Sequence, residues 1–98
     1  MIVTDIVELS KAKYKIFIDG EFAFVLYKGE LRQLKLEKAG EMGESIYHLI
    51  MQDILPKRAK LRAMHLLEKR PYTERAMRDK LQEGLYPQSI IDEAIDYL

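Results

Sequence analysis

The sequence predicts an α+β fold that is mostly helical, in which a small antiparallel β-meander precedes a three-helix unit of the helix-turn-helix kind. Up to residue 27 the apolar residues fall in strand-length runs with a period near two, and from residue 44 they recur at the helical spacing of 3.6. Gly40 and Gly43 separate the two patterns. We therefore expect an N-terminal β region over residues 1–43 and a helical region over residues 44–98.

Three short runs rich in β-branched or aromatic side chains are expected to form the meander: residues 2–7, 14–18 and 22–26. Asp19-Gly20 separates the last two runs and is a strong hairpin signal, because a type I′ turn requires positive φ, which glycine adopts freely. With this two-residue loop, Phe17 faces Phe22 across the hairpin and fixes the register. Such a small sheet needs a helix packed against it.

The first helices follow from apolar spacing. Residues 29–34 form a short candidate helix, and from Glu44 apolar residues recur at i, i+3, i+4 and i+8: Ile46, Leu49, Ile50 and Ile54. Pro56 either kinks this helix or starts a new one in its first turn, where the missing N–H costs nothing. In the next helical stretch, residues 57–70, one face is apolar: Ala59, Ala63, Leu66 and Leu67.

Two more helices complete the unit. Thr73 is a suitable N-cap for a helix over residues 74–83 with Met77 and Leu81 inward. Gly84 is expected as the left-handed C′ residue and Leu85 as its apolar C″ neighbour. Pro87 opens the last helix, whose apolar face has five members: Ile90, Ile91, Ala94, Ile95 and Leu98. The pattern of this helix continues to the last residue without a cap or turn signal, which we expect of a piece of a longer protein.

Composition excludes several classes of protein. The 98 residues contain 16 Lys or Arg and 16 Asp or Glu, and 48% are apolar, which argues against global disorder and against a nucleic-acid-coating protein. The absence of cysteine excludes disulfides and thiolate metal sites and is typical of a reducing compartment. We found no signal peptide or apolar run long enough for a bilayer, so we expect a cytoplasmic protein with no membrane partner.

The charges are unevenly placed along the chain. Residues 56–80 carry nine Lys or Arg against three acids, whereas residues 81–98 carry four acids and no base. On the helix over residues 57–70, four residues lie within about 60° of each other on the side opposite the apolar face: Arg58, Arg62, His65 and Lys69. We take six residues as a candidate interaction surface: Arg58, Arg62, Lys69, Arg70, Arg75 and Arg78. Two interpretations stay open, a solvated helix face or a surface for a polyanionic or acidic partner.

Catalytic signals are weak. His48 and His65 have no carboxylate at metal-ligand spacing, the segment between Gly40 and Gly43 is too short and acidic for a phosphate loop, and no serine sits in a nucleophile elbow. We therefore expect no catalytic residue, no cofactor and no metal site, and we expect that the protein is not an enzyme.

Residues 65–81 resemble the opening repeat of the RecX family of recombination regulators. The residues that carry this resemblance are Leu66, Leu67, Arg70, Pro71, Thr73, Lys80 and Leu81. The link at residues 84–86 and the helix over residues 89–98 also resemble the family, and residues 16–24 resemble the N-terminal β extension of many members. Three features depart from the family pattern: Tyr72 stands where arginine is common, Ala76-Met77 stands where Glu-Leu is usual, and the two further three-helix repeats of the family are absent.

The resemblance implies regulation without catalysis. RecX-like proteins bind RecA recombinase filaments on single-stranded DNA and restrain ATP hydrolysis and strand exchange, so the expected partners are RecA and the single-stranded DNA within its filament. Two alternatives stay open: a stand-alone helix-turn-helix DNA-binding module, and a protein–protein adaptor that binds no nucleic acid. We also expect an exposed apolar patch around Ile91, Ile95 and Leu98, through which the chain would self-associate.

Overall fold

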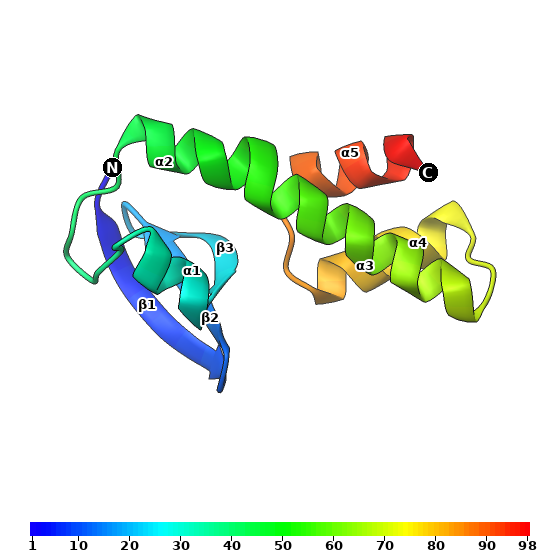
Figure 1. Cartoon of the computed structure of the whole chain (residues 1–98), viewed down its shortest axis with the longest axis horizontal. Coiled ribbons are helices and arrows are strands. Elements are labelled where there is room, and N and C mark those ends of the chain that lie inside the picture. Colours follow the sequence, from blue (N-terminus) through cyan, green and yellow to red (C-terminus); the bar gives the residue numbers. More distant parts are fainter. The chain divides into compact units, whose positions relative to one another are not determined.

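A computed structural model describes all 98 residues and confirms the α+β class, with a three-stranded sheet followed by helices (Figure 1). The chain forms two compact units, Met1–Tyr47 and His48–Leu98. The boundary between them falls inside α2 (Glu44–Leu49). None of the helices is both long and apolar enough to cross a membrane.

The predicted meander is present. Strands β1 (Val3–Ser10), β2 (Lys13–Ile18) and β3 (Glu21–Tyr27) pair antiparallel in that order. The loop is Asp19-Gly20, with φ values of 50° and 86°, and Phe17 faces Phe22 with ring centroids 5.8 Å apart, so the predicted hairpin register is confirmed. The first strand is longer than expected, because β1 continues to Ser10.

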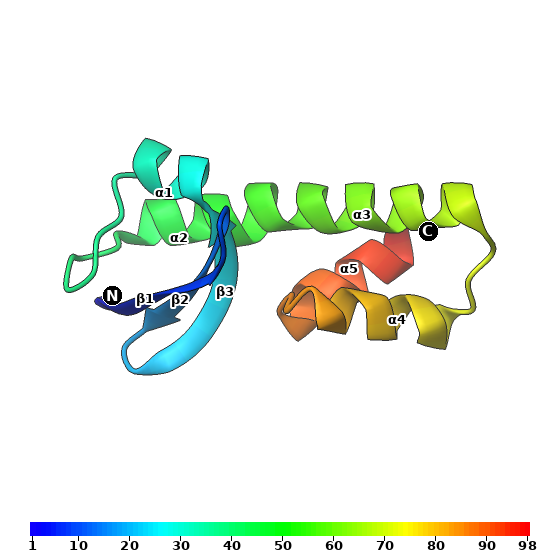
Figure 2. The ribbon, with the colours of Figure 1, turned by 90° about the horizontal axis from the view of Figure 1, so that it is seen from below.

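A bulge in β3 controls which side chains lie on which side of the sheet. Ile16 pairs with Phe24 while Phe17 pairs with Phe22, so Ala23 is the extra residue. Phe24 is buried and its ring centroid lies 6.2 Å from that of Tyr47 in α2. Figure 2 shows α1 (Lys28–Gln33) and α2 on the same side of the sheet. One face is therefore covered by helices and the other, which carries the pair of phenylalanines, is not.

Pro56 neither kinks the chain sharply nor begins a separate helix. It lies in the first turn of α3 (Leu55–Lys69), directly after a π-helical turn, η1 (Ile50–Ile54), that continues from α2. A proline cannot donate to the carbonyl four residues earlier, and the wider π turn accommodates this loss. The inserted π turn also shifts the helical register, so Leu49, which was expected on the inward face, is 41% exposed.

The second unit packs α3, α4 (Glu74–Glu83) and α5 (Gln88–Tyr97) around an apolar core. The predicted inward residues that are buried in this core are Ala59, Ala63, Leu66, Met77, Leu81, Ile90, Ile91 and Ala94, which confirms most of the prediction. Two expectations were wrong. Leu67 is 39% exposed, and Ile91 is buried in the core, so the expected patch on α5 retains only the half-buried Ile95 and the exposed Leu98.

The predicted end of α4 was also wrong. Leu85, not Gly84, has the left-handed conformation, with φ of 62° against −77° at Gly84. The N–H of Leu85 donates to the carbonyl of Gln82 and that of Tyr86 to the carbonyl of Leu81, which is the Schellman pattern with Leu85 at C′. Glycine is required at position 84 for space, because a Cβ there would lie 2.9 Å from the ring of Tyr86.

We predict that Gly84→Ala lowers the free energy of unfolding by about 1 kcal/mol or more, because the new methyl group displaces the Tyr86 ring. Gly43→Ala is the matched control, since a Cβ at Gly43 meets no atom within 4 Å. Urea unfolding of both variants measures the difference. Equal stability of the two variants would contradict this account of Gly84.

Candidate interaction surface

The basic residues between Lys57 and Lys80 differ in whether they have acidic partners. Three lysines make ion pairs: Lys57 with Asp53 at 2.9 Å, Lys60 with Glu93 at 3.2 Å, and Lys80 with Glu83 at 3.8 Å. Four residues are exposed and make no ion pair: Arg62, Lys69, Arg70 and Arg75. We call these four the basic surface. They are the positive charges of the second unit that remain available to a partner.

Two members of the basic surface share one face of α3. Arg62 and Lys69 are seven residues apart, which is two helical turns, and the exposed His65 lies between them. Arg58 lies one turn before Arg62 on the same face, but it is half-buried and has interactions of its own. The predicted stripe is thus present on α3, and it is most open toward the C-terminal end of the helix.

Arg70 is held in place by Tyr72. After α3 the backbone is extended at Arg70, with φ of −166° and ψ of 161°. The guanidinium carbon lies 4.0 Å from the ring centroid of Tyr72, and Nη1 donates to the carbonyl of Pro71 at 3.3 Å. A cation stacked on an aromatic ring keeps its charge and loses part of its mobility. Tyr72 therefore orients the neighbouring positive charge, a role that its position in the sequence did not indicate.

Arg75 lies in the first turn of α4. The helix starts as predicted, because the N–H of Ala76 donates to Oγ1 of the Thr73 N-cap at 3.1 Å. A positive charge in the first turn opposes the helix dipole and costs roughly 0.3–1 kcal/mol. Arg75 has no acidic partner that offsets this cost. Its presence is therefore not explained by the stability of α4.

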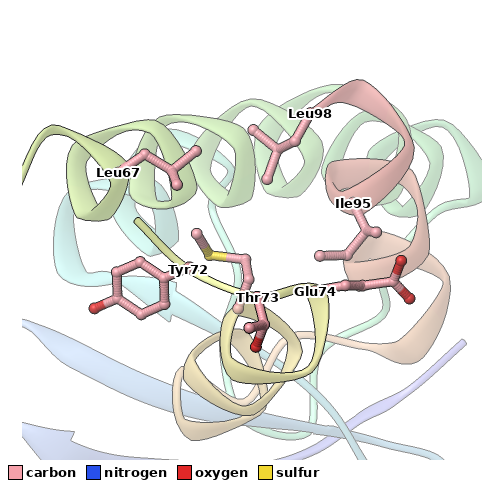
Figure 3. Close-up of a pocket in the computed structure, with 7 residues that line it drawn as sticks. Leu67, Tyr72, Thr73, Glu74, Ile95 and Leu98 are labelled. Atoms are coloured by element: carbon pink, nitrogen blue, oxygen red, sulfur yellow. The ribbon is translucent and has the colours of Figure 1, made fainter. Parts of the chain in front are cut away.

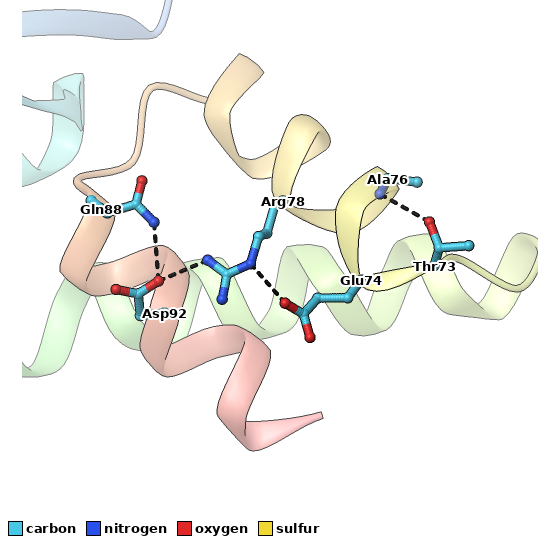
Figure 4. A network of polar contacts seen from close by, with 6 residues as sticks. All are labelled: Thr73, Glu74, Ala76, Arg78, Gln88 and Asp92. Atoms are coloured by element: carbon cyan, nitrogen blue, oxygen red, sulfur yellow. Dashed lines mark hydrogen bonds and ion pairs between the residues drawn. The ribbon is translucent and has the colours of Figure 1, made fainter.

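Arg78, the remaining predicted surface residue, is engaged within the unit (Figure 4). Its Nε donates to Glu74 at 3.1 Å and its Nη1 to Asp92 of α5 at 2.7 Å, and Gln88 also donates to Asp92, at 3.0 Å. The hydrogen bond from Arg78 lowers the pKa of Asp92 below its usual range, and the same bond raises the pKa of Arg78. The charge of Arg78 thus joins α4 to α5 and is balanced locally.

A small apolar pocket opens beside the basic surface, between the end of α3, the start of α4 and the end of α5 (Figure 3). It has a volume of about 240 Å³. Thr73 and Glu74 form its polar border, and its apolar lining is Leu67, Tyr72, Met77, Ile95 and Leu98. Tyr72 belongs to both features, since it lines the pocket and stacks on Arg70.

The unpaired basic side chains and the apolar pocket are groups suited to non-covalent contacts. Arginine and lysine side chains without acidic partners attract phosphates or carboxylates, and arginine binds both in a bidentate manner. The adjacent pocket is large enough for one apolar side chain. The structure contains no group of three His, Cys, Asp or Glu residues that could hold a metal ion.

The family model described as "RecX, first three-helix domain" matches residues 59–98. A protein named regulatory protein RecX from Caldanaerobacter subterraneus subsp. tengcongensis is 33% identical over 97% of this chain and 49% of its own length. The protein of the same name from Clostridium beijerinckii is 32% identical over 96% of this chain and 44% of its own length.

This chain spans about half the length of the curated relatives that it matches. A crystal structure described as regulatory protein RecX has a TM-score of 0.49 and 26% identity, covering 99% of this chain and 48% of that chain.

We predict that Asp92→Asn destabilises the protein at neutral pH and that this difference disappears in acid. The pKa of Asp92 is lowered in the folded state, so its stabilising effect is present at neutral pH and is lost as the pH falls below about 4. Thermal unfolding of both proteins between pH 7 and pH 3 measures it. Asp96→Asn is the control, because Asp96 is exposed and unpaired on the same helix. A gap in melting temperature that stays constant with pH would contradict the prediction.

Proposed function

Because the chain belongs to the RecX family, we propose that it binds RecA recombinase filaments on single-stranded DNA and restrains their activity in recombination and repair. The relatives carry the name regulatory protein, and a regulatory role is what the family supports. The proposal adds to this regulatory role that the protein bound is RecA.

The observation that carries the proposal is the basic surface. Arg62, Lys69, Arg70 and Arg75 are exposed, and none of them has an acidic partner within the chain. A recombinase filament presents DNA phosphates and acidic side chains, both of which suit such a surface. Phosphate contacts would position the protein without reading the base sequence. The ordered guanidinium of Arg70 reduces the entropy lost on binding.

The proposal makes the protein a binding regulator and not an enzyme, located in the cytoplasm. The family's regulatory character favours a binding role. Ion pairs in the second unit also favour it, because the acidic side chains of Glu74, Asp92 and Glu93 are engaged with lysine or arginine at the surface. The lack of cysteine is typical of a reducing compartment.

The stand-alone helix-turn-helix alternative is less well supported. A recognition helix must approach phosphates and base edges in the major groove. The outward side of α5 carries Asp92, Glu93 and Asp96 and no basic residue, and these acids would be repelled by the phosphates. The apolar pocket keeps the protein–protein adaptor as a second candidate, because it offers a seat for a side chain of a partner.

We predict that Arg62→Glu combined with Arg75→Glu weakens filament binding at least tenfold, because each charge-assisted contact contributes about 1.5 kcal/mol or more. The assay is ATP hydrolysis by a preformed RecA–single-stranded-DNA filament, titrated with the chain. Arg32→Glu on α1 is the matched control, since Arg32 is also exposed. We expect inhibition by the original chain and by the control, and loss of inhibition in the double variant.

Two results would overturn the proposal. If the original chain at saturation changes neither filament binding nor ATP hydrolysis, the chain does not act on the filament. If the double variant and the control inhibit equally, the contacts lie elsewhere. An adaptor that uses only the pocket would be insensitive to both charge reversals and would show no dependence on DNA.

A further inference from the structure

The uncovered face of the β-sheet lies outside residues 59–98, which the family model matches. The strand pairing identifies its members. Phe17 pairs with Phe22, and Lys15 of β2 pairs with Val7 of β1. Lys13 precedes Lys15 by two residues on the same strand, so its side chain lies on the same face. We call Lys13, Lys15, Phe17 and Phe22 the aromatic sheet face.

This face is open to solvent at Phe22 and along β1, whereas Val25, which pairs with Lys15, is buried. Both α1 and α2 lie on the opposite side of the sheet (Figure 2). Phe22 is 41% exposed and Val7 is 41% exposed, while Ile16 and Phe24 on the covered side are buried. The Phe22 ring nevertheless has a fixed neighbour, because Phe17 meets it edge-on, with an angle of 68° between the ring planes. An exposed ring held in a fixed orientation offers a surface on which a planar group can stack.

The two lysines of the face make no ion pair. Lys13 is exposed and Lys15 is half-buried. Asp5 is the one acid on this face, opposite Phe17, and it is paired with Lys38 at 3.5 Å. The side chains at i and i+2 of a strand stand about 7 Å apart along it. Lys13 and Lys15 therefore lie in line with Phe17 along β2, on the face that also carries Phe22.

We infer that the aromatic sheet face binds single-stranded nucleic acid, with bases stacked on Phe22 and Phe17 and phosphates at Lys13 and Lys15. Aromatic rings on a sheet and a track of positive charge are the two elements by which proteins hold unpaired bases without regard to sequence. The inference deepens the proposed function, on which it rests, because single-stranded DNA is the polymer that the filament covers.

An acidic, apolar segment of a partner protein is the competing occupant. Such a partner would need apolar volume at position 22 and would accept leucine there. A base stacks on the flat π surface of an aromatic ring and would not bind as well to leucine. Substitution of this one residue therefore distinguishes the two occupants. Phe22 is suited to it, because its exposure makes its replacement tolerable to the fold.

The experiment measures binding of a fluorescent oligodeoxythymidine to the complete 98-residue chain by anisotropy, without RecA. We expect Phe22→Leu to weaken binding about fivefold or more, because stacking contributes at least that factor per base. Phe22→Tyr retains the ring and should retain the affinity. Lys13→Gln with Lys15→Gln should reduce the slope of log affinity against log salt by about 1.4, at about 0.7 per phosphate contact. Thermal melting confirms that each variant is folded.

Each outcome decides the matter. Loss with Phe22→Leu and retention with Phe22→Tyr supports the inference. Equal binding by Phe22→Leu and the original chain, or no oligonucleotide binding at all, overturns it. If Arg62→Glu with Arg75→Glu abolishes oligonucleotide binding while the sheet variants do not, the inference fails and the proposed function stands. If the sheet variants lose oligonucleotide binding but the chain never affects filaments, the proposed function fails and the sheet site stands.

Discussion

Burial of a narrow apolar seam on α3 determines where the charges of the second unit lie. Ala59 and Ala63 are fully buried and Leu66 nearly so, which turns this side of the helix toward α4 and α5. Around the helix axis Arg62 and Lys69 lie beside this seam, and both side chains are exposed. Small residues allow close packing of the helices, and close packing leaves no room for the long basic side chains except at the surface.

The same packing separates structural charges from available ones. Once α4 and α5 lie against each other, Arg78 reaches Glu74 and Asp92, and Lys60 of α3 reaches Glu93 of α5. Exposed ion pairs such as these contribute little to stability. Their functional consequence is larger, because they neutralise Arg78 and Lys60 in place and leave Arg62, Lys69, Arg70 and Arg75 among the unpaired basic residues. A charge count along the chain cannot make this distinction.

Much of the architecture was predictable because it depends on local patterns. The hairpin at Asp19-Gly20, the Thr73 cap and the inward positions of α4 all follow from signals within a few residues. The errors have tertiary causes. Gly84 suggested a left-handed residue, but its small size serves the Tyr86 ring, and Leu85 takes the left-handed conformation.

The site was less predictable than the fold, for the same reason. The basic character of residues 56–80 is visible in the sequence, whereas the partners of Arg78 lie on two helices and the support of Arg70 depends on an extended link. The aromatic sheet face was partly visible, because the hairpin register already paired Phe17 with Phe22. Which side of the sheet the helices cover requires the packed structure.

The most direct test of the central claim is the reactivity of individual lysines toward acetylation, compared between the free chain and the chain bound to a RecA filament. Lys69 belongs to the basic surface, and Lys28 is an exposed lysine at the start of α1. The account predicts that filament binding slows acetylation of Lys69 several-fold and leaves Lys28 unchanged. If Lys69 reacts at the same rate in both states while the chain is demonstrably bound, the basic surface is not the contact.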